Sequence, residues 1–380
     1  MKGIIIGGGI AGLTTAIALQ KIGIQTTVYE AVPEIKTVGA GIWMATNAMQ
    51  VFGHLGFASR IEKEGMSLNK VAIADESLRV IQATNMENIR QKYGHSITAI
   101  HRAKLQRILL EELGNENVEL GKALQSFEER KNSILAHFKD GSSAEADFLI
   151  GAGGIHSNVR KQLFPNVKYR YSGQVCWRGV THFELPPSYQ KATIETWGNQ
   201  IRFGFSAIAA NEVYWFAVKT SPPDRQDDRA TLKEYLSNMF ENFNAPIPSI
   251  LAATPLEKIH KADMYDFKPI PKWHQGRVCL IGDAAHAMTP NMGQGGGQAV
   301  EDAYFLMKSF EANQGADFPS IFAHFQNKRF KKVKTIVNTS KQIGDIAHLK
   351  YGRGLRNFLF RLMPASLAEK QMEVVYGIDY

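Results

Sequence analysis

A glycine-rich turn near the N-terminus, between an apolar strand and an apolar helix, constrains the fold more than any other segment. Residues 2–6 (KGIII) form the expected strand, Gly7-Gly8-Gly9-Ile10-Ala11-Gly12 follows, and residues 13–22 read as the helix. This order is typical of the first unit of a parallel, doubly wound α/β sheet. In such a turn, Gly7 permits the sharp bend, Gly9 lets phosphates approach the backbone, and Gly12 lets the helix pack closely on the sheet.

A second expected strand, residues 25–29, ends at an acidic residue. Glu30 lies eighteen positions after Gly12, close to the spacing at which a carboxylate bonds the hydroxyls of a ribose. The free N–H groups and the positive dipole end of the preceding helix would face the phosphates. Together these features predict a dinucleotide site, but they do not distinguish FAD from NAD.

Two further motifs lie on the C-terminal side of the chain. Residues 277–286 (RVCLIGDAAH) read as a strand ending in Gly-Asp, which places Asp283 where it can reach a ligand in the crevice beyond the strands. A second glycine-rich turn, residues 290–297 (PNMGQGGG), leads into a helix that contains Glu301 and Asp302. Such a turn brings bare N–H groups against an electron-rich ring or an oxyanion.

With both motifs present, the chain resembles the group A flavoprotein monooxygenases of the para-hydroxybenzoate hydroxylase fold. It is most similar to the branch of salicylate hydroxylase, FAD-dependent urate hydroxylase and zeaxanthin epoxidase. The resemblance covers residues 1–340 and is weakest between 170 and 260. It implies an α/β fold with a Rossmann-like FAD-binding domain of the GR2 type, interleaved with a β-sheet substrate domain and followed by C-terminal helices. The expected boundaries are 1–70, 98–168 and 269–330 for the FAD domain, 71–97 and 169–268 for the substrate domain, and 331–380 for the helices.

Carried over by position, the resemblance implies tightly but non-covalently bound FAD, with NAD(P)H as a transient co-substrate. On the adenosine side, the adenine would lie by Leu124, the ribose at Glu30 and Ala31, and the pyrophosphate at Gly7, Gly9, Ile10, Ala11 and Gly12. The ribityl chain would lie at Asp283 and the ribityl-phosphate region at Arg102. The flavin would lie near the stretch from Gly39 to Gly41 and Ile42, with the pyrimidine side of the isoalloxazine at Gly293, Gln294, Gly295, Gly296 and Gly297.

Two positions depart from the family pattern. Gly153 stands where the family usually has the Asp of an Asp-Gly pair associated with both FAD and NAD(P)H, although Ser157 and Arg160 of that motif are retained. Gly297 stands where many members have Asn. Both departures remove side chains near the cofactor, and the first bears on nicotinamide use.

The rest of the chain favours oxygenation over other flavin chemistry. A second GxGxxG, a CxxC and the WxWxIP motif of flavin-dependent halogenases are all missing from the sequence. The resemblance implies that reduced FAD reacts with O2 to form a C4a-hydroperoxide, which delivers one oxygen atom to an electron-rich ring. The alternatives are an epoxidase, an antibiotic-inactivating oxygenase resembling the tetracycline destructases, and a flavin-binding protein that does not oxygenate.

Between residues 169 and 268 the pattern changes to strands. Residues 173–183, 193–197, 201–208 and 213–218 read as an antiparallel sheet over the flavin, and 227–243 read as a helix. Aromatic residues in this region predict a flat apolar pocket, and arginines are suited to a substrate carboxylate or phenolate. The substrate-binding candidates are Arg178, Arg202, Phe203, Phe205, Tyr214 and Pro290.

Composition limits the remaining possibilities. The 380 residues suggest about two domains, and the net charge is +8 without a nucleic-acid motif. The two cysteines, Cys176 and Cys279, predict neither a disulfide framework nor a metal site.

We expect a cytoplasmic monomer or homodimer without a transmembrane segment, a metal or a nucleic-acid partner. The amphipathic C-terminal helices would pack on the FAD domain or a partner, or act as a lid or a peripheral membrane contact.

Overall fold

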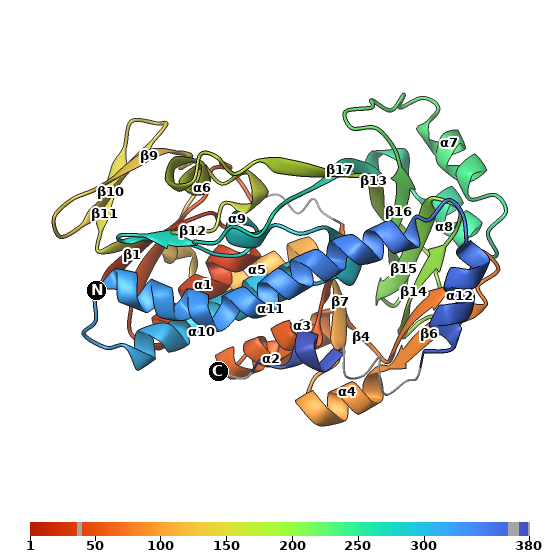
Figure 1. Ribbon diagram of the computed structural model, residues 1–380, viewed down its shortest axis with the longest axis horizontal. Coiled ribbons are helices and arrows are strands. Elements are labelled where there is room, and N and C mark those ends of the chain that lie inside the picture. Colours follow the sequence, from red (N-terminus) through yellow and green to blue (C-terminus); the bar gives the residue numbers. More distant parts are fainter. Residues whose placement is uncertain (36–39, 364–371, 379–380) are drawn as a thin grey trace.

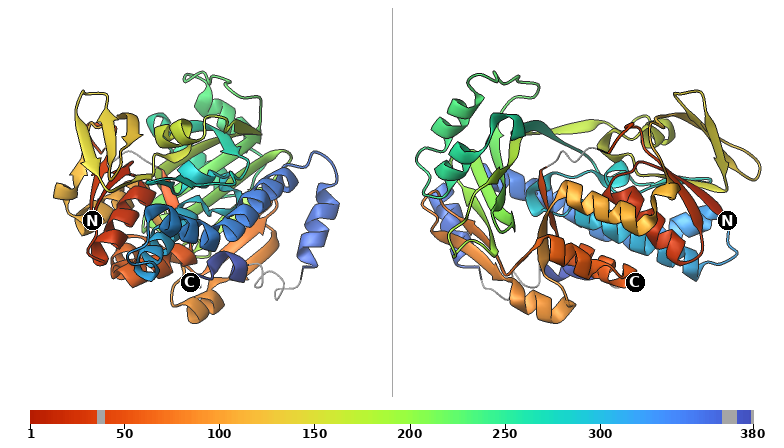
Figure 2. Two further views of the ribbon diagram at one scale, coloured as in Figure 1. Left: turned by 60° about the vertical axis from the view of Figure 1, so that its left-hand side comes forward. Right: turned by 180° about the vertical axis from the view of Figure 1, so that it is seen from behind.

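The computed structural model describes residues 1–35, 40–363 and 372–378. Two sheets stand at opposite ends of an elongated molecule, and the long helix α11 extends from one toward the other (Figures 1 and 2). This arrangement confirms the expected α/β fold with two sheet bodies. Gly39, expected near the flavin, lies outside the described residues.

The first body is built on a six-stranded sheet with the order β18-β19-β12-β1-β2-β8. Its strand pairs are parallel except for β18–β19. β1 lies between β2 and β12, so the turn that follows β1 opens at the carboxyl edge of the sheet. The strands are β1 (Lys2–Ile6), β2 (Gln25–Tyr29), β8 (Val118–Glu119), β12 (Phe148–Gly151), β18 (His274–Gln275) and β19 (Val278–Leu280).

The second body is a seven-stranded sheet with the order β17-β13-β16-β15-β14-β5-β6. All four expected strands are confirmed. The sheet is not wholly antiparallel, because β14 pairs with β5 in parallel. The strands are β5 (Lys70–Ala74), β6 (Val80–Asn85), β13 (Tyr169–His182), β14 (Ala192–Trp197), β15 (Ile201–Ala209), β16 (Glu212–Thr220) and β17 (His260–Phe267).

Two three-stranded sheets and the helices complete the fold. One small sheet comprises β3 (Gly41–Met44), β7 (Ile97–His101) and β4 (Met66–Leu68), and the other comprises β11 (Ser143–Ala146), β10 (Ile134–Phe138) and β9 (Leu124–Glu129). The helices are α1 (Ile10–Lys21), α2 (Thr46–Leu55), α3 (Ala58–Glu64), α4 (Met86–Tyr93), α5 (Arg102–Leu113), α6 (Asn158–Leu163), α7 (Leu232–Met239), α8 (Ile247–Ala253), α9 (Asp283–His286), α10 (Gly295–Ala312), α11 (Phe318–Ala347) and α12 (Arg353–Arg361), with 3₁₀ turns η1 (Asn115–Asn117), η2 (Gly154–His156), η3 (Leu256–Lys258) and η4 (Pro290–Met292).

Two sequence-based expectations differ from the structure. The helix expected at 227–243 is shorter, because the side chain of Asp228 accepts a hydrogen bond from the Ala230 N–H (2.9 Å) and forms a turn before α7. The boundary expected between residues 330 and 331 falls inside α11, which continues without a break.

The two bodies have separate apolar cores. One core lies around the six-stranded sheet and helices α1, α10 and α11, and the other lies between the seven-stranded sheet and helices α7 and α8. Within the described ranges, no helix is both long and apolar enough to cross a bilayer. The contact between helix α1 and strand β1 depends on Gly12, where an added Cβ would lie 2.0 Å from the carbonyl oxygen of Gly7.

Replacing Gly12 with Ala should therefore lower the free energy of unfolding by about 1–3 kcal/mol, because the backbone on both sides must move. Gly9→Ala is the matched control, since a Cβ at Gly9 would meet no atom within 4 Å and its φ of −81° suits any residue. Urea titrations of both FAD-free variants check this. Equal stabilities would contradict the packing role of Gly12.

Candidate functional site

The turn between β1 and α1 presents free backbone donors to an open space. Gly7 has a φ of +116°, which places it in the region that favours glycine. Helix α1 begins after Gly9 without a side-chain cap and without an acidic residue in its first turn. Its first N–H groups and its positive dipole end are therefore available to a diphosphate, as the sequence predicts.

Glu30 and a residue not predicted from the sequence support this turn. The carboxylate of Glu30 accepts hydrogen bonds from the backbone N–H of Gly8 (2.6 Å) and of Val32 (3.1 Å). The Gln106 side chain on α5 donates to the Gly8 carbonyl oxygen (2.9 Å). Each carboxylate oxygen of Glu30 has further acceptor capacity, so the same residue can shape the turn and accept from a ribose hydroxyl.

Asp283 and Arg102 lie close enough for their charges to interact, although they belong to elements far apart in sequence. Desolvation by the surrounding protein raises the pKa of the Asp283 carboxyl, although part of the side chain is open to solvent, and the charges of His286 and Arg102 oppose the rise. Both Asp283 and Arg102 retain exposed surface. The structure thus brings together two residues that were assigned separately to the ribityl region and its phosphate.

The second glycine-rich turn leads from η4 into α10. Gly293 has a φ of +61°, and a Cβ on Gly296 would lie 3.0 Å from Met44 and 3.4 Å from Ile42. At Gly297 an added Cβ would lie 3.0 Å from the side-chain amide of Asn47. Asn47 on α2 thus occupies the space beside Gly297, where many family members carry an Asn on the turn itself.

A buried ionic network lies directly beneath the Gly-Asp turn at Gly282 and the second glycine-rich turn. Arg329 on α11 donates to Asp302 through Nε (2.8 Å) and also to Glu301, and all three residues are fully buried. Asp302 accepts from the Gly282 N–H (2.8 Å) and from His286 Nε2 (2.6 Å). Burial alone would raise the pKa of Asp302, but His286 and Arg329 hold it below its ordinary value. The network therefore fixes the Gly-Asp turn from below, and His286 is part of this support.

Trp43 on β3, which the sequence analysis did not single out, links the glycine turn to the seven-stranded sheet. Its ring lies 6.1 Å from that of Tyr214 and 5.7 Å from that of Phe216, and its Nε1 donates to Ser206 Oγ (2.8 Å). The position of a Cβ on Gly293 is 3.8 Å from the Trp43 ring. An aromatic residue two positions after Gly41 was the signal that could have identified it.

The same apolar cluster includes other elements. Met292 of the η4 turn and residues Val375 and Tyr376 of the C-terminal segment belong to the same apolar cluster as Trp43. The backbone carbonyl of Tyr376 accepts a hydrogen bond from the Gln50 side chain (2.8 Å), which holds this residue in place. Burial raises the pKa of Tyr214 well above its ordinary value, and nearby Arg178 opposes the rise.

The two candidate arginines differ sharply in their surroundings. Arg202 is buried and donates to Glu195, His348, Gln174 and Asn291 at 2.7–3.2 Å. Desolvation, followed by the charge of Arg202, lowers the pKa of His348 to about 2, so its Nε2 accepts from Arg202 as a neutral ring. Arg178 is half-buried, and its Nε has no hydrogen-bond partner within the described residues. Of these two candidates, Arg178 is thus the one with an unpaired donor in the described part of the chain.

Phe203 and Phe205 do not belong to this site, contrary to expectation. Both are fully buried on the opposite face of the sheet, where Phe203 stacks on Trp215 (5.5 Å) and contacts Phe240 (5.2 Å). Strand alternation, which separates them from Arg202 and Gly204, points them toward α7 and α8. They form the core of the sheet rather than the wall of the pocket.

The other predicted positions are placed as follows. Leu124 is buried in β9, Ala31 and Pro290 are exposed, and Gly153 is exposed at the end of β12. A Cβ on Gly153 would make only an ordinary contact, 3.4 Å from Ser157 Cα. Packing therefore does not require glycine where the family usually has Asp.

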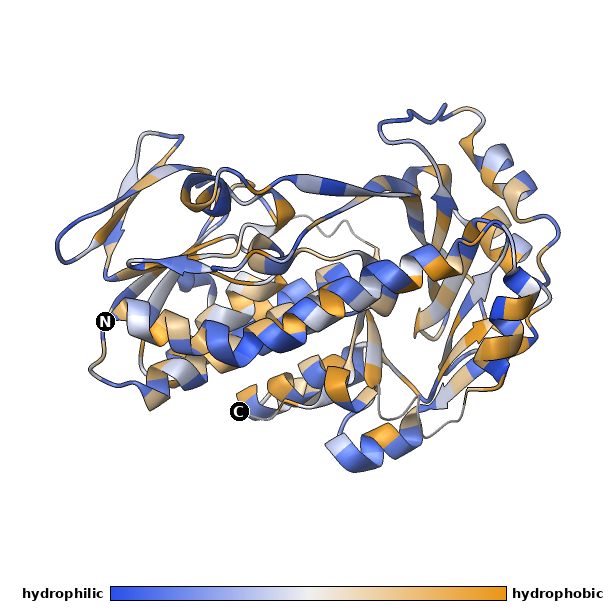
Figure 3. Ribbon diagram, in the orientation of Figure 1, coloured by the Kyte–Doolittle hydropathy of each residue, from blue (hydrophilic) through white to orange (hydrophobic). Residues whose placement is uncertain are grey.

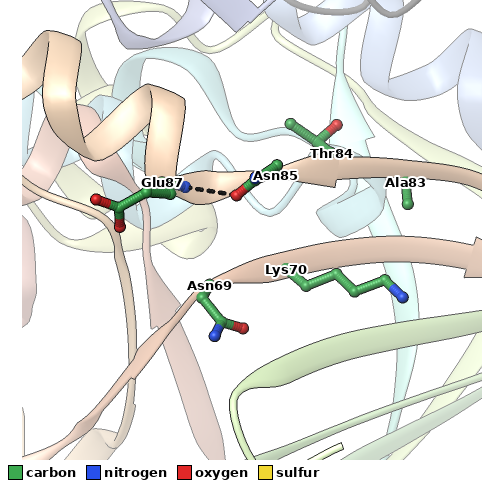
Figure 4. A pocket seen from close by; sticks show the side chains of 6 residues that line it. All are labelled: Asn69, Lys70, Ala83, Thr84, Asn85 and Glu87. Atoms are coloured by element: carbon green, nitrogen blue, oxygen red, sulfur yellow. Dashed lines mark hydrogen bonds between the residues drawn. The ribbon is translucent and has the colours of Figure 1, made fainter. Parts of the chain in front are cut away.

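A surface hollow elsewhere does not coincide with this site. It is lined by Asn69, Lys70, Ala83, Thr84, Asn85 and Glu87 (Figure 4). Asn69 lies between β4 and β5, and the other five residues belong to β5, β6 and the start of α4. None of the six is a predicted FAD or substrate contact. The dashed line in Figure 4 is the capping hydrogen bond that the Glu87 N–H donates to the Asn85 side chain (2.9 Å) at the start of α4.

Asp283→Ala should weaken FAD binding by about tenfold to a hundredfold, because a hydrogen bond to a charged group contributes roughly 1.5–3 kcal/mol. Asp283→Asn is the control that keeps an acceptor oxygen and should lose less. Titrating each FAD-free protein with FAD measures the effect. A variant that binds FAD as tightly as the parent would remove Asp283 from the site.

The comparisons with known proteins agree with this geometry. A family described as "FAD binding domain" matches residues 1–340. Aurachin C monooxygenase/isomerase from Stigmatella aurantiaca is 36% identical over 363 residues, 95% of this chain and 94% of that protein. The 2-heptyl-3-hydroxy-4(1H)-quinolone synthase of Pseudomonas aeruginosa is 30% identical over 373 residues, 96% of this chain and 94% of that protein.

A solved structure shows the same likeness in three dimensions. Klebsiella pneumoniae HpxO complexed with FAD and uric acid is similar with a TM-score of 0.91 and 30% identity, over 99% of this chain and 97% of that chain. The chain therefore belongs to the FAD binding domain family, in its branch of flavin-dependent aromatic and heteroaromatic monooxygenases.

Proposed function

We propose that the protein hydroxylates a nitrogen-containing bicyclic ring that carries an apolar substituent, using NAD(P)H and O2 in a reducing cytoplasmic compartment. The observation that carries this proposal is the aromatic cluster of Trp43, Tyr214 and Phe216, which lies next to the glycine turn. Arg178, whose Nε is unpaired among the described residues, stands opposite Phe216 in the pairing of β13 with β16. FAD, when bound, would supply the chemistry by accepting a hydride and transferring one atom of O2 to the substrate.

The protein residues would bind FAD without a further prosthetic group. The N-terminus of α1 would hold the diphosphate, Glu30 the ribose, and Asp283 with Arg102 the ribityl-phosphate region. This fit rests on the open space at Gly9 and on the exposed surfaces of Asp283 and Arg102. The backbone donors of the turn at 293–297 would face the flavin ring and withdraw charge from it.

The substrate pocket would combine an apolar wall with few polar groups, as is typical of small-molecule sites. Trp43 and Phe216 supply flat apolar surface. The Tyr214 hydroxyl can donate a hydrogen bond, as a phenol does at neutral pH. Arg178 would pair with a carbonyl or phenolate oxygen of the ring, and its charge would stabilise the electron-rich form that accepts oxygen.

Arg202 would position the pocket rather than bind substrate. Its four side-chain partners join β15 to β13, β14, η4 and the segment after α11. Because all of these donors are used within the protein, a substrate would have to displace an existing bond to reach the guanidinium. Arg202 therefore connects the sheet to the turn that precedes Gly293.

A second candidate is hydroxylation of a purine such as urate. The similarity to HpxO, whose structure holds uric acid, favours it. The similarity to a heptyl-quinolone synthase favours the alkylated bicyclic ring. The methionine and aromatic side chains around Trp43 match an apolar substituent better than a polar purine.

The test is the rate of NADPH and NADH oxidation by the FAD-loaded protein over a panel of phenols, purines and 2-alkylquinolones, with peroxide monitored. A 2-alkylquinolone should stimulate oxidation with little peroxide and yield a product one oxygen atom heavier. In the same assay, Arg178→Met should raise KM by about tenfold or more, whereas Arg178→Lys should recover part of the loss.

Two outcomes would contradict the proposal. Coupled turnover of urate and not of quinolones would select the second candidate. Oxidation that yields only peroxide with every compound would argue for a flavin protein that does not oxygenate this class of ring.

A further inference from the structure

Helix α12 lies at the far edge of the molecule beside β6 (Figure 1), and its apolar side chains are exposed. Leu355, Phe358, Leu359 and Leu362 lie at helical spacing i, i+3, i+4 and i+7, which places them on one face. Their exposed fractions are 64%, 55%, 56% and 61%. Figure 3 shows hydrophobic and hydrophilic residues interspersed along this helix. An ordinary surface helix would bury this face.

The buried side of α12 is instead polar and firmly attached. Arg356 is only 5% exposed and lies 5.0 Å over the ring of Trp197, and it donates to the Ala347 carbonyl (2.9 Å). Arg353 pairs with Glu76 (2.7 Å) at one end of the helix. Phe360 packs on Trp197 at 5.4 Å. These contacts fix the orientation, so the outward apolar face belongs to the folded protein.

The charges around the face are mostly positive. Residues 346–363 contain Lys350, Arg353, Arg356 and Arg361 and no acidic residue. The acidic groups that meet them are Glu76 and Asp75, and Asp75 is also paired with Arg79 (2.9 Å). Arg356 is buried beneath the helix and does not face the strip. The accessible basic groups are therefore Lys350, Arg353, Arg361 and Arg79, against the two acidic groups.

We propose that α12 docks on an anionic membrane surface. An in-plane helix that inserts Leu and Phe while basic residues meet lipid phosphates has this combination of faces. Each Lys or Arg near an anionic surface contributes about 1 kcal/mol. A second copy of the chain fits less well, because a two-fold contact would bring the same patch, and hence Lys350 and Arg361, against its own copy. An apolar substrate partitioned into the bilayer would then be within reach of the enzyme.

The experiment uses full-length, FAD-loaded protein sedimented with vesicles of equal parts phosphatidylglycerol and phosphatidylcholine, or of phosphatidylcholine alone. The protein should bind the anionic vesicles, and added salt should weaken this binding. Leu355→Ser combined with Leu359→Ser should lower the partition coefficient at least about tenfold. Val374→Ser is the matched control, because Val374 is 55% exposed on the C-terminal segment.

Circular dichroism and the oxidation rate with a water-soluble substrate show that each variant is folded, since the replaced side chains are exposed and lie outside the proposed active site. Absence of binding to anionic vesicles, or equal binding by the double variant, would overturn the proposal. Sedimentation velocity without lipid provides the other test. A dimer that becomes a monomer in the double variant would show that a second copy covers the face, and would also overturn it.

Discussion

The contact between Arg329 and the adjacent acids Glu301 and Asp302 supports both sides of the proposed FAD site. Asp302 accepts a hydrogen bond from the Gly282 N–H, which fixes the backbone next to Asp283. Glu301 accepts hydrogen bonds from Asn47 and Lys332. Burying these charges is costly unless each has a partner, and here each carboxylate is bonded to cationic or amide donors. The turn proposed to face the flavin is thus fixed by charges buried beneath it.

The two faces of the seven-stranded sheet have different roles: one forms an apolar core with helices, and the other lines the proposed substrate pocket. Its outer face carries Phe203, Phe205 and Trp215, which pack beneath α7 and α8. Its inner face carries Tyr214, Phe216 and Ser206, which meet Trp43. Because neighbouring residues of a strand alternate between faces, a change at one position can alter the pocket while its neighbour keeps the core intact.

The parts of the site that were predicted from the sequence are those formed by residues close together in the chain. The strand–turn–helix at Gly7 to Gly12 was predicted because glycine spacing and strand order impose one backbone path. The pairing of Arg329 with Glu301 and Asp302 was not, because a basic run on a helix most often faces solvent and nothing local shows that one member turns inward. Phe203 and Phe205 were assigned to the wrong face, because alternation separates two faces of a strand without showing which one meets the cofactor. Trp43 was missed because its partners lie on strands more than a hundred residues away.

The dependence of the flavin site on the buried network can be measured by the FAD dissociation constant of Arg329→Lys. Lysine keeps the charge but loses the planar fork that reaches Glu301 and Asp302 together. Arg130→Lys is the control, because Arg130 forms half-exposed surface pairs with Glu128 and Glu145. We expect FAD to bind at least about tenfold more weakly to Arg329→Lys and unchanged to the control. A folded Arg329→Lys protein that binds FAD as tightly as the parent would contradict the role assigned to the network.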